Sequence, residues 1–571
     1  MSANYPGTAS VALCLATLLL AGPAPAQQPA PQNAGPPPPA EPRPDLPAAV
    51  LRVTTRLVLV DVVVTDKDGR PVTGLTRDDF TLLEEGRPQT VASFSFESSA
   101  SRAAGWTQPP PLPPNIYTNR PQQRTPPGPL TLLLLDSLNT PWRDQAYMRQ
   151  QMLTYIRTQV QPEQRVAILA LSNNLIVLQD FTTDSRLLLA ALQKFSGERS
   201  VELSRAEPVE VPAEVFAGAP AQVVERLTAG LERFNAEQVA ATTDSRVVTT
   251  LAALRAIARA TAGYPGRKNL IWVSAAFPFT LVPERAENFD MFRSYATEVR
   301  RTAAVLTDAQ IAVYPVDARG LVGETSVDVV SPSDPFRIVS SHHTMNQLAQ
   351  DTGGKAYYNR NDIEVAVSSA VADGASYYSL AYYPEDKNWD GKFRRVEVKL
   401  NRKDLQVRHR RGYYATELGS SEVESKKKKD EKAELREITS ILSDPMPATA
   451  ITFLARVQPP ADNQVVAEFR VDASTLLLEP APNGRRFKAD FLVAAVSPDG
   501  RVVTSASRTV EAALDAQALA KVQASGLPFK LPMTLVPGRY QRLRLVVRDQ
   551  LSGLAGAVDV PLTLEVGGSK P

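Results

Sequence analysis

The chain has 571 residues, of which 43% are hydrophobic, and it carries 63 Lys and Arg against 61 Asp and Glu. A chain of this length is too long for one hydrophobic core, so we expect two or three folded domains. The formal net charge of +2 gives no reason to expect a nucleic-acid partner or binding to an acidic membrane surface, because both require a marked excess of basic residues.

The N-terminal stretch 1–26 has the features of a secretory signal peptide. The apolar run VALCLATLLL over 11–20 is short for a membrane span, and Ala24-Pro25-Ala26 supplies the small residues that a signal peptidase requires. No basic residue precedes this run, which indicates a weak signal or a misplaced start codon. A membrane anchor is the alternative. We predict export to the periplasm, the cell envelope or the medium, with no membrane span left after cleavage. Cys14, the only cysteine, would be removed with the signal, which excludes disulfides and thiol ligands.

Three short regions follow. Residues 27–48 are rich in Pro and Ala and predict an extended tether. Residues 49–97 contain β-branched runs separated by turn residues, which predict a small β unit. Pro-rich stretches over 98–129 predict a linker.

From residue 130 to residue 416, apolar runs of strand length alternate with amphipathic helical stretches. The runs LTLLLLD, RVAILALS, NLIWVSAAF and IAVYPVD are typical of strands buried on both faces. We therefore predict an α/β domain with a doubly wound, mostly parallel, Rossmann-like sheet. Ligands of such sheets bind at the carboxyl ends of the strands, where Asp136 and Asp317 stand in the sequence.

Several motifs of this region resemble those of a von Willebrand factor A-type domain. They are Asp136 after an apolar strand, a β-hairpin expected at Ser172–Asn174, PGRKNLIWVS over 265–274 and IAVYPVDARGL over 311–321. The flanking stretches VTDKDGRPVTGLTRDDFTLLEEGRPQ, SYYSLAYYPEDKNWDGKFRRVEVKL and RRGYYA are similar to the bacterial VWFA-related family described from acidobacteria. The resemblance covers roughly residues 50–415 and implies an A-type fold used for protein interaction.

A-type domains usually bind a divalent ion at a metal-ion-dependent adhesion site, where a partner's carboxylate completes the coordination. The resemblance implies ligands from three loops: an Asp-x-Ser-x-Ser motif, a Thr and an Asp. Here the first motif is Asp136-Ser137-Leu138-Asn139-Thr140, and Thr243 or Thr242 is the second-loop candidate, before a helix expected from Ser245. Hard oxygen ligands of this kind suit Mg²⁺.

The motif is incomplete in this chain. Leu138 stands where a Ser should coordinate, and Ser274-Ala275-Ala276 stand where the third-loop Asp belongs. One carboxylate with Thr140 and Thr243 does little to offset the dehydration of Mg²⁺. We predict a degenerate site, with no cofactor required.

Asp136 then has a structural role at the end of its strand. Its carboxylate would accept hydrogen bonds from loop amides, with Ser137 and Asn139 helping. Asp317 could add a carboxylate to the same crevice, although an Asp at a strand end is ordinarily a turn former. Ser137, Asn139 and Asp317 are the candidates for a binding face around Asp136.

The sequence contains no recognisable motif of catalysis. His342, His343 and His409 are the only histidines, and no Gly-x-Ser-x-Gly elbow, phosphate-binding loop or zinc motif occurs. We predict that the protein is not an enzyme. The alternative is a hydrolase with an unrecognised site, which alanine at Asp136 or Asp317 would inactivate.

Two insertions, over 196–243 and 319–341, are longer than a compact sheet needs. They are candidates for a partner-binding face. For the amphipathic stretch AQVVERLTAGLERF over 221–234, an equal alternative is that it covers an edge of the core.

A charged linker over 417–435 and alternating strands over 436–567 complete the chain and predict an antiparallel β-sandwich. The predicted protein is an exported, non-enzymatic module for protein interaction whose partner is unknown. Its rival is a Mg²⁺-dependent adhesion module in which Asp136 and Thr140 hold the ion for a partner's carboxylate.

Overall fold

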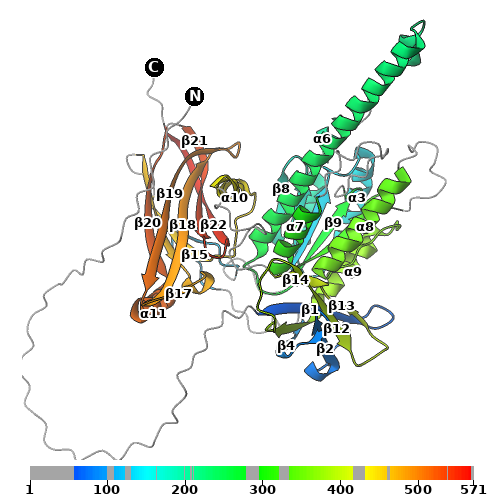
Figure 1. The fold of residues 1–571 in the computed structure, drawn as a ribbon. Helices are drawn as coiled ribbons and strands as arrows, with labels where there is room; N and C mark the ends of the chain where they lie inside the picture. Colours follow the sequence, from blue (N-terminus) through cyan, green and yellow to red (C-terminus); the bar gives the residue numbers. More distant parts are fainter. Residues whose placement is uncertain are drawn as a thin grey trace, which may run out of the picture. The chain divides into compact units, whose positions relative to one another are not determined.

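The computed structural model describes residues 57–98, 109–121, 130–161, 164–197, 200–205, 209, 211–277, 295–320, 334–415, 431–458, 463–536 and 538–566. They all lie within Thr55–Pro571, and Figure 1 draws them as a ribbon coloured by position in the chain. The predicted signal peptide and tether lie outside the described residues. No helix in the described part of the chain combines the length and the apolar character that crossing a bilayer requires.

A five-stranded mixed sheet forms the centre of the α/β domain. Its strand order is β10-β9-β6-β7-β8, and β8 is the strand that runs antiparallel to its neighbour. The strands are β6 (Leu130–Asp136), β7 (Arg165–Leu171), β8 (Leu175–Thr182), β9 (Lys268–Ser274) and β10 (Ile311–Asp317). Every residue of β6, β7, β9 and β10 is buried, since both faces of the sheet are covered. The mixed α/β class predicted from the sequence is confirmed.

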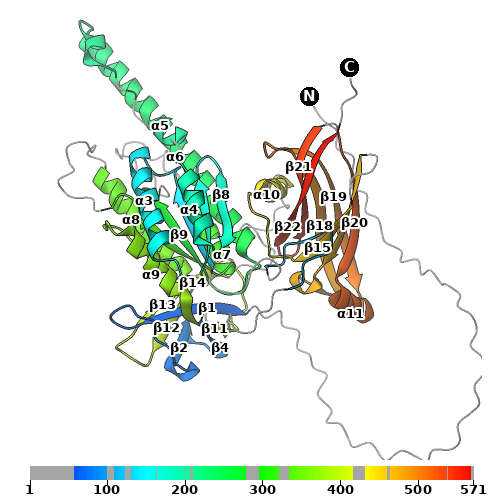
Figure 2. The ribbon, with the colours of Figure 1, turned by 180° about the vertical axis from the view of Figure 1, so that it is seen from behind.

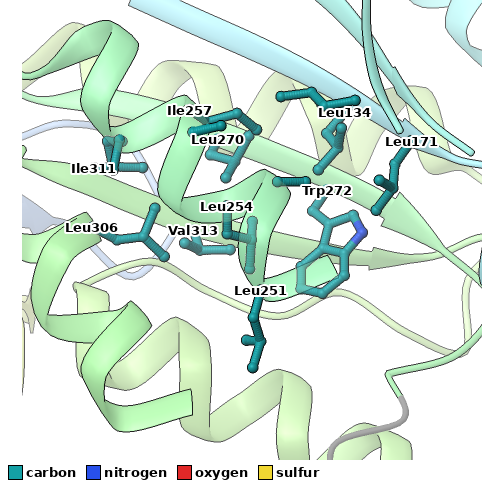
Figure 3. Packing of buried hydrophobic residues seen from close by; sticks show 14 of the residues in the cluster. Leu134, Leu171, Leu251, Leu254, Ile257, Leu270, Trp272, Leu306, Ile311 and Val313 are labelled. Atoms are coloured by element: carbon teal, nitrogen blue, oxygen red, sulfur yellow. The ribbon is translucent and has the colours of Figure 1, made fainter. Parts of the chain in front are cut away.

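Two groups of helices cover this sheet. Leu132 and Leu134 of β6 pack against α6 (Ala221–Thr261), α7 (Ala296–Asp308) and α8 (Asp334–Thr352) on one face (Figure 3). Leu133 and Leu135 pack on the other face against α3 (Trp142–Thr158), α4 (Ser185–Lys194) and α9 (Ile363–Ala375). Alternate residues of this strand therefore pack into two separate hydrophobic cores, one on each face of the sheet. The short α5 (Val201–Arg205) and η2 (Ala213–Phe216) lie in the connection from α4 to α6.

Strands from both sides of the α/β domain form one β unit with a shared core. One sheet has the order β13-β1-β11-β4 and the other β14-β12-β2-β3. Residues 376–414, which we had placed in the α/β domain, therefore pair with strands of the N-terminal unit. The elements are β1 (Val58–Thr65), η1 (Arg77–Asp79), β2 (Phe80–Glu84), β3 (Arg87–Pro88), β4 (Val91–Ser98), β11 (Ser376–Tyr382), β12 (Phe393–Leu400), β13 (Gln406–Arg408) and β14 (Gly412–Tyr414).

The C-terminal region has two antiparallel sheets around a common apolar core. Their orders are β20-β16-β15-β5 and β17-β18-β21-β22, and β19 also pairs with β18. The elements are α10 (Glu431–Ser443), β15 (Phe453–Val457), β16 (Gln464–Val471), η5 (Ala473–Thr475), β17 (Glu479–Ala481), β18 (Gly484–Val496), β19 (Val502–Leu514), α11 (Ala516–Ser525), β20 (Leu527–Thr534), β21 (Gly538–Asp549) and β22 (Ala555–Val566).

A short strand from the region where we expected only a linker joins this C-terminal sheet. β5 (Ile116–Thr118) pairs with β15, and the next residue, Asn119, is fully buried. The Asn119 Nδ2 donates to the carbonyls of Ala448 (3.1 Å) and Ile451 (2.8 Å), and its Oδ1 accepts from the Phe453 N–H (3.0 Å). One side chain therefore satisfies three main-chain groups that belong to a distant part of the sequence.

Replacing Asn119 with alanine should strip these main-chain groups of their partners. We expect Asn119→Ala to lower the free energy of unfolding of the C-terminal sheets by about 2 to 3 kcal/mol. The chain's four Trp residues all precede β15, so hydrogen exchange of β15 and β16, followed by mass spectrometry, is the suitable measurement. Arg120→Ala is the control, because its ion pair with Asp472 is partly exposed and should contribute less than about 1 kcal/mol. Equal losses in both variants would contradict this account of Asn119.

His409 follows β13 in the chain and is held against β12 as a neutral imidazole. Its Nε2 accepts from the Val398 N–H (3.1 Å), and its Nδ1 lies 2.7 Å from the Arg410 carbonyl oxygen, to which it donates. Because Nε2 is occupied as an acceptor, a second proton has no place there. Burial is the main cause that lowers the pKa of His409 below its ordinary value of 6.5.

This lowered pKa makes the stability of the β unit dependent on pH. The unfolded chain binds a proton at His409 more readily than the folded chain, so stability should fall as pH drops below about 6.5 and through the folded-state pKa. Urea titrations at a series of pH values measure this. His409→Gln should flatten that part of the profile. His343→Gln, at an exposed position in α8 and outside the β unit, is the matched control; a flat wild-type profile would refute the role of His409.

Candidate functional site

The crevice at the carboxyl end of the central sheet is built around Asp136. β6 ends at this residue, and the backbone N–H groups of Ser137 and Leu138 both donate to the Leu171 carbonyl at the end of β7 (2.8 and 2.9 Å). The loop then continues, fully buried, to Thr140 before α3 begins at Trp142. Two neighbouring strand ends therefore fix the path of the motif that the sequence identified.

The Asp136 carboxylate is completely buried, and protein donors occupy both oxygens. Oδ1 accepts from the Asn139 N–H (3.0 Å). Oδ2 accepts from three donors: Asn139 Nδ2 (2.9 Å), Trp272 Nε1 (2.9 Å) and Ser274 Oγ (2.8 Å). Burial raises the pKa of Asp136 above its usual range, and the hydrogen bonds from Asn139, Ser274 and Trp272 oppose that rise.

A buried cation from α6 completes this network. Arg246 is 3% exposed, and its Nε donates to Asn139 Oδ1 (2.9 Å). The Asn139 Nδ2 also lies 3.0 Å from Thr250 Oγ1, to which it donates. Asn139 thus connects the carboxylate of Asp136 to the guanidinium of Arg246 through both ends of its amide.

The two threonines proposed as metal ligands lie in different settings. Thr140 is buried, and its Oγ1 accepts from the Ala275 N–H (3.1 Å), where the family pattern places a third-loop Asp. Thr243 lies inside α6 and not on a loop ahead of it. The helix runs through this position because the stretch NAEQVAATTDS before Arg246 contains neither Gly nor Pro.

The donor set around Asp136 does not match the ligands that Mg²⁺ takes. The indole N–H of Trp272 and the amide N–H of Asn139 have no lone pair to offer, and the Asn139 oxygen is bound to Arg246. The Ser137 Oγ is buried without a hydrogen-bond partner among the described residues. Across those same residues, no group of three or more His, Cys, Asp or Glu is placed to hold a metal ion.

Asp317 ends β10 and belongs to a separate polar cluster. Its carboxylate accepts from Arg319 Nε (2.9 Å) and Nη2 (2.6 Å), and His342 Nε2 lies 3.1 Å from Oδ2. The His342 ring stacks on Tyr358 with centroids 4.1 Å apart. Burial opposes ionisation of Asp317, but the hydrogen bonds from His342 and Arg319 outweigh it and lower the pKa of Asp317. The structure gives no hydrogen bond between this cluster and Asp136 among the described residues.

Two side chains that define the crevice were not predicted from the sequence. Trp272 lies within an apolar strand and carries no signal that its indole N–H would point at Asp136. Arg246 is far from Asp136 in the sequence, and charged residues on helices are usually solvated. The sequence offered only an indirect signal for them: an Asp at the end of a buried strand requires hydrogen-bond donors nearby, but the sequence does not say which residues supply them.

No protein-family model matches the chain, and no curated protein sequence matches it. Among solved structures, the chain is similar to an aerotolerance-related membrane protein from Bacteroides fragilis NCTC 9343, with 11% identity over 43% of this chain and 98% of the other and a TM-score of 0.23. It is similar to the conserved hypothetical protein BatB from Bacteroides thetaiotaomicron, with 12% identity over 43% of this chain and 99% of the other and a TM-score of 0.23. It is also similar to a von Willebrand factor type A structure from Catenulispora acidiphila, with 8% identity over 62% of this chain and 81% of the other and a TM-score of 0.23. Similarities at these levels carry no information about a partner or an activity.

Removing the Asp136 carboxylate should leave several buried donors without an acceptor. We expect Asp136→Ala to lower the free energy of unfolding of the α/β domain by about 3 kcal/mol or more. Urea unfolding followed by tryptophan fluorescence measures this, since buried Trp272 contacts the carboxylate. The control is Ser137→Ala in the same loop, which removes a buried hydroxyl that has no partner in the described part of the chain and should cost little. A neutral Asp136→Ala would contradict the structural role of the carboxylate.

Proposed function

We propose that this chain is an exported, non-enzymatic protein-interaction module built on a von Willebrand factor A-type domain related to the acidobacterial family, and that it binds partners without a divalent ion. The observation that carries the proposal is the state of Asp136. The only carboxylate of the motif is buried and bound by Asn139, Trp272 and Ser274.

The sheet of the α/β domain supports the A-type assignment. Its hairpin from β7 to β8 turns at 172–174, where the resemblance requires one. Asp136 ends a central strand, with the strands β7 and β9 on either side. In that assignment, the crevice is where an A-type domain presents its metal, but its chemistry differs.

The position of Arg246 also favours a crevice without metal. The guanidinium of Arg246 lies one side chain away from Asp136, on the far end of the Asn139 amide. The guanidinium occupies the Asn139 oxygen, which is therefore not available to coordinate an ion beside Asp136. Mg²⁺ would also have to displace three hydrogen bonds to reach Oδ2 while losing its own water. In this proposal, the hydrogen bonds around Asp136 hold the loop in place of a metal ion.

The arrangement around Asp317 supports the absence of catalysis. The pair of Asp317 and His342 is the candidate that the hydrolase alternative needs. However, the Asp317 carboxylate is already paired with Arg319, and the His342 ring lies against Tyr358. These contacts give both groups a structural role in attaching α8 to the end of β10.

The absence of a metal requirement has a direct test. We expect the thermal unfolding midpoint of the purified protein, treated with EDTA, to show no saturable rise on titration with Mg²⁺, Mn²⁺ or Ca²⁺, because a ligand specific for the native state must raise it. The same titration of Asp136→Asn is the matched control. A saturable rise that this variant lacks would establish metal binding in the crevice and overturn the proposal in favour of a Mg²⁺-dependent adhesion module.

Partner binding should likewise not depend on divalent ions. Proteins that the purified chain captures from an envelope extract of its own organism should be retained equally in EDTA and in Mg²⁺. Capture that EDTA abolishes would contradict the metal-independent mode, even if the midpoint of unfolding does not move.

A further inference from the structure

The helix α6 extends well past the α/β domain. It has 41 residues, and its buried residues begin only at Thr242. In Figures 1 and 2 its first half projects from the domain as a single arm. The segment 221–241, which we call the α6 arm, is about 30 Å long at the rise of an α-helix. Every residue of the α6 arm is exposed or partly exposed. The stretch 221–234 therefore does not cover a core edge, which was one of the two interpretations of this insertion.

An apolar stripe runs along the α6 arm. Val223 is 45% exposed, Leu227 54% and Phe234 54%, and their spacings of four and seven positions place them on one side of the helix. Val248, 56% exposed, continues this side. Side chains that face the sheet in the second half, such as Leu254, point in the opposite direction. The stripe faces away from the domain's own core.

The stripe side carries no charged residue between Val223 and Val248. Helical geometry places on it Val223, Leu227, Gly230, Leu231, Phe234, Gln238, Ala241, Ser245 and Val248. Glu237 lies at the edge of this side, three positions after Phe234, and the other Glu and Arg residues of the arm lie further round the helix. Large exposed apolar side chains on an uncharged surface are typical of a protein-binding surface.

A seven-residue sequence repeat overlaps the stripe at Leu227, Leu231 and Phe234. Residues 224–230 read VERLTAG and residues 231–237 read LERFNAE, so each repeat has apolar residues at its first and fourth positions and Glu-Arg between them. Apolar residues spaced three and four apart in a seven-residue period are the pattern by which one helix packs along another with the same period.

Among the described residues, the preceding connection contacts the helix at Asn235, on one flank of the arm, and at Ser245, near the domain end of the stripe. The Asn235 Oδ1 accepts from the Val209 N–H (3.0 Å), and its Nδ2 donates to the Val209 carbonyl (3.2 Å). Nearer the domain, Ser245 Oγ donates to Glu202 (3.4 Å). Leu231 is partly covered, but Leu227 and Phe234 remain exposed.

We propose that the α6 arm is a dimerisation element, on which the α6 arm of a second copy of this chain packs through the apolar stripe. A second copy fits for two reasons. The segment itself carries the seven-residue period that such packing requires, and a stripe without charge meets its own copy without repulsion. Helices of this length gain most of their stability from packing, so pairing also explains a projecting helix. This surface is remote in the sequence from Asp136, and the proposal does not depend on the state of the crevice.

Sedimentation equilibrium of the purified protein, over roughly two decades of concentration, tests the proposal. We expect the wild type to be a dimer and the double variant Leu227→Glu/Phe234→Glu to dissociate with a Kd raised at least about 100-fold, because four charges enter an apolar interface. The matched control is Ala229→Glu/Ala236→Glu, which adds the same charges to exposed positions on the opposite side of the same helix. Both double variants should remain folded, so their circular dichroism spectra, and their unfolding midpoints at concentrations where the samples are monomeric, should be the same.

A monomeric wild type at all concentrations would overturn the proposal, as would equal Kd values for the two double variants. Disulfide trapping gives an independent readout in a Cys14→Ser background, which has no other cysteine. Leu227→Cys should crosslink to itself in a parallel pair, and a mixture of Leu227→Cys with Phe234→Cys should crosslink in an antiparallel pair. Either result supports pairing through the stripe. Crosslinking that is no faster than that of Ala229→Cys would contradict it.

Discussion

The hydrogen-bonded carboxylate of Asp136 is the constraint on which the centre of the α/β domain depends. It joins the end of β6 to Trp272 and Ser274 of β9 and, through Asn139, to Arg246 of α6. A buried carboxylate without these donors would be strongly unfavourable, so each of them is held in place by the others. The crevice is consequently a filled part of the core, although it occupies the site where strands of this kind present ligands.

If the crevice is filled, the interaction function that we propose requires a surface elsewhere on the molecule. The connection between α4 and α6 provides such a surface, because the α6 arm extends a core helix into solvent. The second half of α6 packs on the sheet and contributes Arg246 to the network at Asp136. The first half presents Leu227 and Phe234. One continuous helix thus links the polar centre of the domain to an exposed apolar stripe.

The order of strands in the chain differs from their order in space. β1 pairs with β11, which follows the whole central sheet in the sequence, and β5 pairs with β15. The α/β domain is therefore inserted into a β unit whose halves lie on either side of it in the sequence. Asn119 likewise satisfies main-chain groups of the C-terminal sheets. These pairings make the regions of the chain interdependent, since loss of one partner leaves buried backbone groups unsatisfied.

The sequence by itself determined the elements that local periodicity defines. Its apolar runs predicted β6, β7, β9 and β10, and its short polar break predicted the hairpin at 172–174, because burial on both faces and turn chemistry are encoded by neighbouring residues. It also showed that the motif at Asp136 has one carboxylate. Only the tertiary structure decided what surrounds that carboxylate, which strands join across the α/β domain and whether the face of 221–234 is covered. Those outcomes depend on contacts between residues far apart in the chain, and no local pattern records them.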